Sequence, residues 1–398
     1  EWTLPAQPAN IYANLVRQAK AAGWYDGQRA FLRGGIWKNF FSRYPESNWM
    51  HKRMLSLSSR LALLREPIHN EIMKRKLYEA QANDAYWHGL FGGLYLPHLR
   101  RAVFRALIEL ETMLDACEVR AARFLEDTDL DGIEELYLQN GRIQAVLKLD
   151  GSGSICELDS YVLKHNFGDT LKRQVEHYHE QIYRSGSGGP QHSGGGIASA
   201  HERVSFKHKI DAVDLEADDH ARSLFVDRLN GGFVAYLHPT FPAEGTEDVG
   251  WTVDLLSEHV QKNIELAGNG VYVSYRFPPG ATGVFSTEIN LAMPSCDGWG
   301  GRYIQDGTVL CGFGQLLELS AMAGLTLDDN VLGGSVKLKI SSPVALIAQP
   351  CYSVSQSEGG FEKIMQAVTL TLEWPLTLGD VVVSLEVGER QDISVFSA

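Results

Sequence analysis

The hydrophobic period of this chain changes once, near residue 118, and that change constrains the fold more than any other feature of the sequence. Before it, apolar residues recur every three or four positions, the spacing of a helix with one buried face. Because such helices bury their apolar faces against one another, residues 1–117 are predicted to form a helical bundle domain. The clearest apolar runs are Met50, Met54, Leu57, Leu61 and Leu64, and then Leu99, Val103, Leu107, Leu110 and Leu114.

After residue 118 the period becomes two, which is typical of strands with one buried face. Residues 118–398 are therefore predicted to form a large antiparallel β-sandwich domain, with a flexible Gly/Ser-rich loop near residues 184–198. The expected fold class is α+β multidomain, with an N-terminal helical bundle followed by the sandwich. The strand-like runs include GVYVSYRFPPG, KLKISSPVALI, AVTLTLEWPL and VVVSLEVGE.

Charge and composition exclude several classes of function. Of the 398 residues, 36 are Lys or Arg and 49 are Asp or Glu, which gives a net charge of −13. This balance argues against nucleic-acid and membrane partners and suits a neutral or cationic ligand. No apolar run approaches the ~20 residues that span a bilayer. Five widely spread cysteines favour a reduced, cytoplasmic setting. The chain opens at Glu1 without a signal-peptide pattern, so Glu1 is interpreted as a boundary left by maturation or truncation.

The segment QANDAYWHGLFGGLYLPHLR, residues 81–100, holds the densest mixture of polar, aromatic and glycine residues. Aromatic rings stack on the apolar faces of sugars, while carboxylate, amide and imidazole groups bond the sugar hydroxyls. The segment is therefore predicted to contact a carbohydrate or a similar polyol. The alternative is a helix end whose aromatic residues fill the core and whose glycines turn the chain.

A second motif, DTDLDGIEE, places alternate Asp residues before a glycine. Such spacing wraps oxygen ligands around a hard cation such as Ca²⁺. The twelfth position is Leu138 rather than Glu, so the motif is not an EF-hand, and Glu134 or Glu135 would have to complete the site. The alternative is a solvated Asp-Gly turn. The candidate calcium ligands are Asp127, Asp129, Asp131 and Glu135, and no other cofactor is expected.

Two weaker patterns involve histidines. His177 and His179 are two residues apart, which would place both on one face of a strand, but without an obvious third metal ligand a structural pair is favoured. His238 and Glu288 could serve as the acid and base of a mutarotase-like enzyme, a hypothesis that rests on fold analogy alone. The sequence contains no Gly-rich phosphate loop, dinucleotide fingerprint, HExxH or GxSxG motif.

Four separated segments resemble family 57 glycoside hydrolases, the α-amylase and 4-α-glucanotransferase group. QANDAYWHGLFGGLYLPHLRRAV is similar to the last signature region of that family, and GGIWKNFFSRYPESNWMHKRML to the helical segment that follows its catalytic barrel. DTDLDGIEELYLQNGRIQAVLKLDGSGSICELD resembles the opening of the family's C-terminal sandwich, and QPCYSVSQSEGGFEKIMQA a late signature of it. These segments occur in the family's order and cover most of the chain.

The resemblance implies that the chain is the C-terminal half of such an enzyme. In the family, an N-terminal irregular (β/α) barrel carries the nucleophilic Glu and the acid/base Asp, and EWTLP resembles the stretch just after the acid/base region. No catalytic residue is therefore expected in this chain, which alone should be inactive. The resemblance also implies a galactose-mutarotase-like sandwich. The residues that it would place against bound glucan are Asn83, Asp84, Trp87 and His88.

The expected function is to complete the substrate cleft of an α-1,4-glucan-acting hydrolase or glucanotransferase and to stabilise its barrel. The expected partners are an α-glucan or oligosaccharide and the missing N-terminal catalytic barrel. A surface shaped for the barrel would be apolar and exposed, so a homo-oligomer is also expected. The alternative is a stand-alone carbohydrate-binding or scaffold module. The choice between amylase and glucanotransferase stays open, because the residues that decide it are absent.

Overall fold

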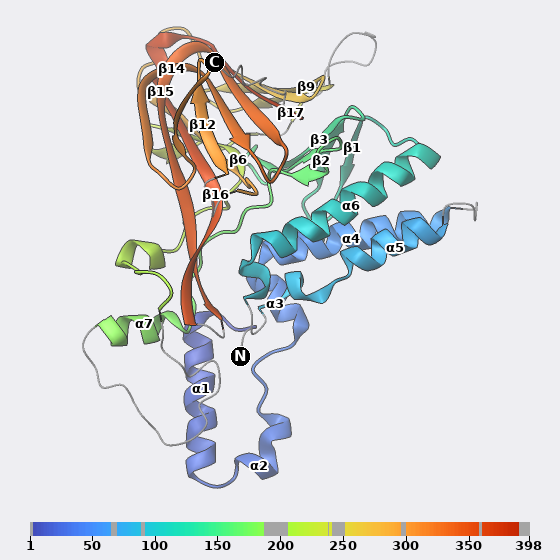
Figure 1. Cartoon of the computed structure of the whole chain (residues 1–398), viewed down its shortest axis with the longest axis vertical. Coiled ribbons are helices and arrows are strands. Elements are labelled where there is room, and N and C mark those ends of the chain that lie inside the picture. Colours follow the sequence, from blue (N-terminus) through green and yellow to red (C-terminus); the bar gives the residue numbers. More distant parts are fainter. Residues whose placement is uncertain are drawn as a thin grey trace, which may run out of the picture.

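Helices occupy the first third of the chain and strands most of the rest, as the hydrophobic period predicts (Figure 1). The computed structural model describes residues 3–64, 70–88, 92–186, 206–237, 239–240, 251–295, 300–357 and 360–389. The sixth helix ends at Cys117 and the first strand begins at Arg123. The helices are α1 (Ala6–Ala21), α2 (Tyr25–Gln28), α3 (Trp37–Arg43), α4 (Pro45–Leu63), α5 (Asn70–Ala80), α6 (Pro97–Cys117) and α7 (His179–Gly186).

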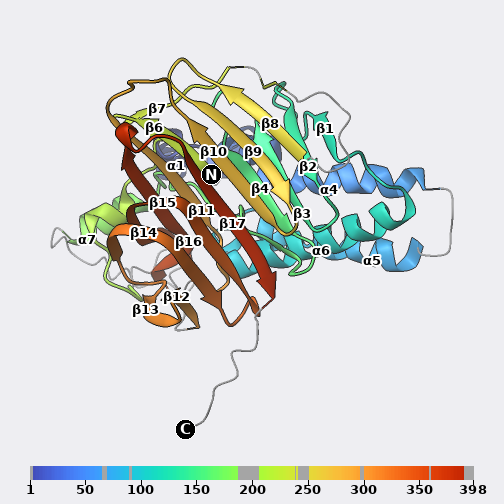
Figure 2. The same ribbon diagram turned by 90° about the horizontal axis from the view of Figure 1, so that it is seen from above.

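Helices α4, α5 and α6 lie side by side and share one apolar core (Figures 1 and 2). Pro45 and Pro97 open α4 and α6, where the missing N–H is not needed for an intrahelical bond. The two predicted apolar runs face this core, and all their members except Leu64 and Leu99 are buried. Strand residues also enter the core, including Tyr137. The bundle therefore depends on the strands for part of its packing.

Helices α1 and α2 project away from α4–α6 (Figure 1). In α1 only Ala9 and Ala19 are buried, and α2 has no buried residue. Residues 6–36 are here named the N-terminal arm. Among the described residues, α3–α6 supply the buried core of the bundle, while the apolar side chains of the arm find little to cover them.

The strands form one continuous antiparallel sheet that folds back into two layers around a second core (Figure 2). This confirms the predicted α+β class and the antiparallel sandwich. Hydrogen-bonded neighbours run from β1 through β2, β3, β4, β6, β11, β16, β15, β17, β10 and β9 to β8. The strands are β1 (Arg123–Glu126), β2 (Glu135–Gln139), β3 (Ile143–Lys148), β4 (Ile155–Ser160), β5 (His165–Asn166), β6 (Leu224–Leu229), β7 (Gly232–Phe233), β8 (Trp251–Leu256), β9 (Gln261–Ala267), β10 (Gly270–Arg276), β11 (Val284–Leu291), β12 (Gly301–Gln305), β13 (Thr308–Gly312), β14 (Leu317–Asp329), β15 (Gly334–Ser357), β16 (Gly360–Pro375) and β17 (Val381–Glu389).

Strands β15 and β16 form a long hairpin that reaches beyond the two layers toward α7 (Figure 1). Near its end, Val354 and Phe361 pack against Tyr178 and Ile182 in a small apolar cluster. On β16, the Gln366 amide donates to the carbonyl of Tyr95 at 2.9 Å. The hairpin therefore connects the sandwich to α7 and to the segment that precedes α6.

Some predictions fall outside the described residues. The Gly/Ser-rich loop near residues 184–198 is outside them from residue 187 onward, and so is His238. Within the described ranges, no helix has both the length and the apolar character needed to cross a membrane.

Candidate functional site

The turn between α5 and α6, residues 81–96, carries the residues predicted to contact glucan. It contains two short 3₁₀ helices, η2 (Asn83–Tyr86) and η3 (Gly93–Tyr95). The φ angle of Gly93 is 52°, and a Cβ there would lie 2.0 Å from the Trp87 carbonyl oxygen, so only glycine fits. The Leu94 N–H donates to the same carbonyl at 2.9 Å. This close approach fixes the backbone of Trp87.

The side chains of the turn divide between solvent and core. Asn83 and Asp84 are exposed, and Trp87 is 37% exposed. The next residue, His88, is only 1% exposed, and its ring lies 5.2 Å from the ring of Tyr95. The structure therefore places Asn83, Asp84 and Trp87 where a ligand could touch them. It places His88 in the interior, where it can support the turn but does not face solvent.

Two further hydrogen bonds anchor the turn to the neighbouring helices. The Tyr86 hydroxyl donates to the Ala80 carbonyl oxygen at 2.6 Å, and the Ser47 hydroxyl of α4 donates to the Tyr86 carbonyl oxygen at 2.5 Å. Tyr86 is buried, so both bonds are shielded from water. The exposed amide, carboxylate and indole of the turn thus lie beside a buried, hydrogen-bonded residue, the kind of support that a binding surface requires.

Beside the turn lies a buried carboxylate, that of Glu176, which the sequence analysis does not predict. Glu176 accepts hydrogen bonds from the Tyr44 and Tyr95 hydroxyls, each at 2.6 Å, and from the guanidinium of Arg43. Burial raises the pKa of the Glu176 carboxyl, although Arg43 and the tyrosine hydroxyls oppose that shift. Glu176 belongs to no motif or period, so nothing in the sequence singles it out. It joins α3 and the turn to the segment before α7.

An aromatic path connects the turn to the exposed N-terminal arm. The rings of Trp37 and Phe41 are 4.9 Å apart, those of Phe41 and His51 are 4.6 Å apart, and those of His51 and Tyr86 are 6.0 Å apart. Trp37 is 46% exposed. Beyond it the arm exposes a series of large apolar side chains. These are Ile11, Leu15, Trp24, Phe31 and Ile36.

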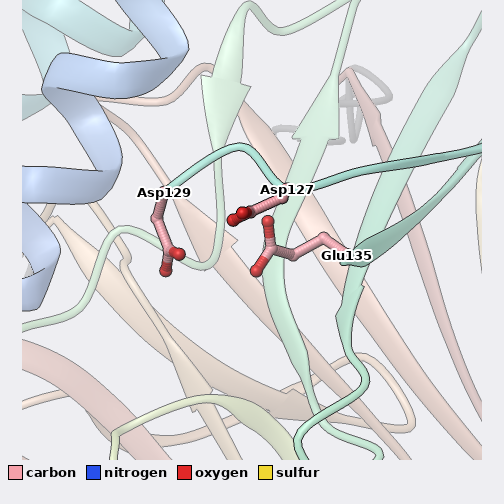
Figure 3. Close-up of side chains that lie close together, drawn as sticks. All are labelled: Asp127, Asp129 and Glu135. Atoms are coloured by element: carbon pink, nitrogen blue, oxygen red, sulfur yellow. The ribbon is translucent and has the colours of Figure 1, made fainter. Parts of the chain in front are cut away.

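The acidic loop before β2 brings three of its four candidate ligands together (Figure 3). Asp127, Asp129 and Glu135 each offer a carboxylate oxygen, and these oxygens lie within 4.8 Å of one another. Asp131 does not belong to this group, and its carboxylate accepts the Ile133 N–H at 2.8 Å. Asp127 also accepts the N–H groups of Asp131 and Gly132, both at 3.1 Å, as an Asx-type turn does.

Lys148 supplies a positive charge to the same loop. Its ammonium donates to Asp129 and, at 2.6 Å, to Glu135. Burial raises the pKa of the Glu135 carboxyl, and the ion pair with Lys148 limits that shift. A calcium ion would therefore compete with an internal ammonium for two of its ligands. Calcium binding by Asp127, Asp129 and Glu135 stays a prediction.

The histidine pair lies in a different setting from the one expected. His177 lies in a turn and His179 is the first residue of α7, so the two do not share a strand face. His179 is buried, and its Nδ1 accepts the Glu176 N–H at 3.2 Å. Burial lowers the pKa of His179 to about 4. Within the described residues the pair forms no group of three potential metal ligands.

Among the described residues, the histidine beside Glu288 is His220; its predicted partner His238 lies outside them. His220 Nε2 lies 3.1 Å from Glu288 Oε1, and His220 Nδ1 lies 2.5 Å from Asp219. The hydrogen bond to Glu288 raises the pKa of His220. Burial alone would raise the pKa of Glu288, but hydrogen bonds from His220 and Asn290 lower it. The two side chains are hydrogen-bonded to each other, so they are not arranged as separate acid and base on either side of a substrate.

The geometry defines an α+β protein whose helical part presents an exposed amide, carboxylate and indole between α5 and α6, beside an antiparallel sandwich. The chain belongs to the alpha-amylase/4-alpha-glucanotransferase family. The family's middle-domain model matches residues 35–114, and its C-terminal model matches residues 127–235 and 248–385. This confirms the resemblance, and it assigns the turn to the middle domain and the sandwich to the C-terminal domain.

Similar proteins support the same assignment. A 4-alpha-glucanotransferase of Thermococcus kodakarensis is 33% identical over 395 residues, which are 94% of this chain and 56% of that protein. An alpha-amylase of Pyrococcus furiosus is 33% identical over 405 residues, 96% of this chain and 55% of that protein. The crystal structure of the 4-alpha-glucanotransferase of Thermococcus litoralis superposes with a TM-score of 0.71 at 28% identity, covering 97% of this chain and 56% of that one. The chain spans about half the length of these relatives.

Proposed function

We propose that this chain is the non-catalytic C-terminal half of an α-1,4-glucan-acting hydrolase or glucanotransferase of glycoside hydrolase family 57, and that it contributes one wall of the glucan cleft. The observation that carries the proposal is the exposure of Asn83, Asp84 and Trp87 on one short segment, residues 83–87. An indole can stack on a pyranose ring, while the amide and carboxylate bond its hydroxyls. His88 would not contact the glucan; its buried ring packs beneath the turn and supports it.

The bond-breaking step would belong to a catalytic barrel that this chain does not include. Supporting this, the chain matches the family's middle and C-terminal models and covers 56% of a relative named as a glucanotransferase. A retaining mechanism needs two carboxyl groups about 5 Å apart on either side of the scissile bond. We assign no catalytic residue to this chain, and we expect it to be inactive alone.

The second role that we propose is stabilisation of the barrel. The N-terminal arm exposes Phe31 by 86% and Ile36 by 56%, and such apolar side chains gain free energy when another surface covers them. The aromatic path from Trp37 to Tyr86 links this surface to the turn. A barrel that covers the arm would therefore also complete a cleft beside Trp87.

A chimeric enzyme tests the proposal. The N-terminal part of the Thermococcus kodakarensis glucanotransferase, joined ahead of this chain, should turn over maltooligosaccharides, while this chain alone should not. Trp87→Ala in the chimera should lower kcat/KM at least tenfold, because the stacking surface is lost. Tyr78→Ala, which removes an exposed aromatic ring on α5, is the matched control and should leave kcat/KM unchanged. Equal activity of the two variants would contradict a cleft role.

A stand-alone carbohydrate-binding or scaffold module is the second candidate. One observation favours it: the exposed residues Asn83, Asp84 and Trp87 and the hydrogen bonds that hold the turn all belong to this chain. It predicts that the chain binds maltooligosaccharides by itself and that an added barrel does not change the affinity. We also propose a cytoplasmic setting, which the free cysteines Cys117, Cys156, Cys311 and Cys351 support.

A further inference from the structure

A cavity of about 620 Å³ lies where the helical bundle meets the sandwich. One wall comes from the start of α4, including Glu46 and Trp49, and others from residues 150–154, residues 219–223 and Phe233 of β7. Its volume falls in the range of small-molecule sites. None of its described lining residues belongs to the turn 81–96, so the cavity is separate from the proposed cleft surface.

Two aromatic side chains of the cavity, Trp49 and Phe233, differ in their exposure to solvent. Trp49 is 7% exposed, and its indole N–H donates to Glu157 at 2.5 Å, so its ring is fixed. Phe233 is 48% exposed, and the Arg228 guanidinium lies 3.7 Å from its ring centroid. Lys148 Nζ lies 5.1 Å from the Trp49 ring centroid, so a ligand would make its apolar contact mainly with the exposed ring of Phe233, on the face away from Arg228. Flat apolar faces of this kind suit the C–H faces of sugar rings.

The polar groups of the cavity favour a neutral ligand over an anion. Seven of its described lining residues carry carboxyl groups, against two permanent cations, Lys148 and Arg222. Both cations are already paired, Lys148 with Glu135 and Arg222 with Asp218. A phosphate group would therefore meet an excess of negative charge without an unengaged cation to offset it.

Exposed carboxylates in the cavity lining can accept hydrogen bonds from the hydroxyl groups of a ligand. Asp150 is exposed, and its described hydrogen bond comes from the Ser152 N–H at 2.9 Å. Asp131 is likewise exposed and accepts the Ile133 N–H at 2.8 Å. An ionised carboxylate has about four acceptor positions, so both residues can accept further bonds. Sugar hydroxyls are the neutral groups that both donate to carboxylates and accept from nearby N–H groups.

We propose that this cavity is a second, non-catalytic binding site for a short neutral oligosaccharide. The choice of an α-1,4-glucan as its ligand rests on the proposed function, whereas the cavity, its aromatic walls and its carboxylates do not. The site would hold a second stretch of glucan away from Trp87, with Phe233 stacked on a sugar ring and Asp150 bonded to its hydroxyls.

Isothermal titration of the full 398-residue chain with maltotetraose tests this. Phe233→Ala and Asp150→Ala alter exposed side chains, so both variants should keep the wild-type circular dichroism and Tm. Each should lower the affinity of one site at least tenfold while a second, Trp87-dependent site is retained. Tyr78→Ala and Asp380→Ala, which change an exposed aromatic and an exposed carboxylate outside the cavity, are the matched controls. Glucose 1-phosphate should bind the cavity at least tenfold more weakly than maltose.

The possible outcomes separate the two proposals. Wild-type titration curves for both Phe233→Ala and Asp150→Ala would overturn the cavity site. Loss of all binding in Trp87→Ala alone would also overturn it, while leaving the proposed cleft surface intact. Loss of all binding in Phe233→Ala, with Trp87→Ala unchanged, would support the cavity site and contradict the role of Trp87. Tighter binding of glucose 1-phosphate than of maltose would overturn the assignment to a neutral ligand.

Discussion

At the scale of single residues, Lys148 is the counter-ion of the acidic loop. Its ammonium contacts Asp129 and Glu135, and the Glu135 side chain is fully buried. Lys148→Met keeps the apolar stem but removes the charge, so it leaves close carboxylates without their counter-ion. We expect a loss of roughly 1–3 kcal/mol in the free energy of unfolding at neutral pH, measured by urea denaturation.

Calcium should restore stability to that variant. With the ammonium gone, Asp127, Asp129 and Glu135 offer oxygen ligands at the spacing that a hard cation needs. Millimolar Ca²⁺ should therefore raise the Tm of Lys148→Met more than that of the wild type. The double variant Lys148→Met, Asp129→Asn is the control and should lose this response. An equal effect of Ca²⁺ on all three proteins would contradict a site at this loop.

Residue types in the sequence singled out one candidate segment but could not divide its side chains between surface and core. Asn83, Asp84, Trp87 and His88 lie within six positions, and all four side chains suit sugar binding. Only the packing shows that His88 is buried next to Tyr95 while the other three reach solvent. The 3₁₀ geometry of the turn has neither the helical nor the strand period, so no periodic pattern could assign a face to each residue.

At the scale of elements, Gly93 holds the shape of the candidate site. A Cβ at this position would lie 2.0 Å from the Trp87 carbonyl oxygen, in a left-handed conformation that disfavours alanine. Gly93→Ala should cost about 2 kcal/mol or more in the free energy of unfolding and should weaken maltooligosaccharide binding. Thermal unfolding and titration calorimetry measure the two effects.

Gly27→Ala provides the matched comparison. Gly27 lies in α2, and a Cβ there would meet nothing within 4 Å. Alanine favours helices over glycine, so this variant should be as stable as the wild type or slightly more stable. If Gly93→Ala unfolded at the same temperature as Gly27→Ala, the close approach to Trp87 would not constrain the turn.

The elements themselves were largely predictable because their hydrophobic periods are regular. The apolar runs of α4 and α6 are buried almost entirely, and the alternating runs became long strands of one antiparallel sheet. The position of α1 was not predictable. Its composition suits a helix, but whether Ile11 and Leu15 are covered depends on which other surface is present. Periodicity gives the apolar face of a helix and not its partner.

At the scale of the whole molecule, the N-terminal arm predicts self-association. Its exposed apolar residues should pair with those of a second copy when no barrel covers them. Light scattering should therefore show a mass above that of the 44.1 kDa monomer that increases with protein concentration. Phe31→Ser should reduce this association, since Phe31 is 86% exposed. Val331→Ser, a change at an exposed apolar residue between β14 and β15, is the control. A monomer at every concentration would contradict the prediction.

The sequence by itself determined the class of the protein and its family. A change of period near residue 118 separated helices from strands, and four ordered segments carried the family resemblance, because both signals lie in short stretches of chain. The tertiary structure decided which distant residues lie together. Glu176 meets Tyr44 across 132 positions, and His220 meets Glu288 across 68. The junction cavity gathers segments from α4 to β7. Such contacts depend on how the layers pack, and no local pattern of residues records that packing.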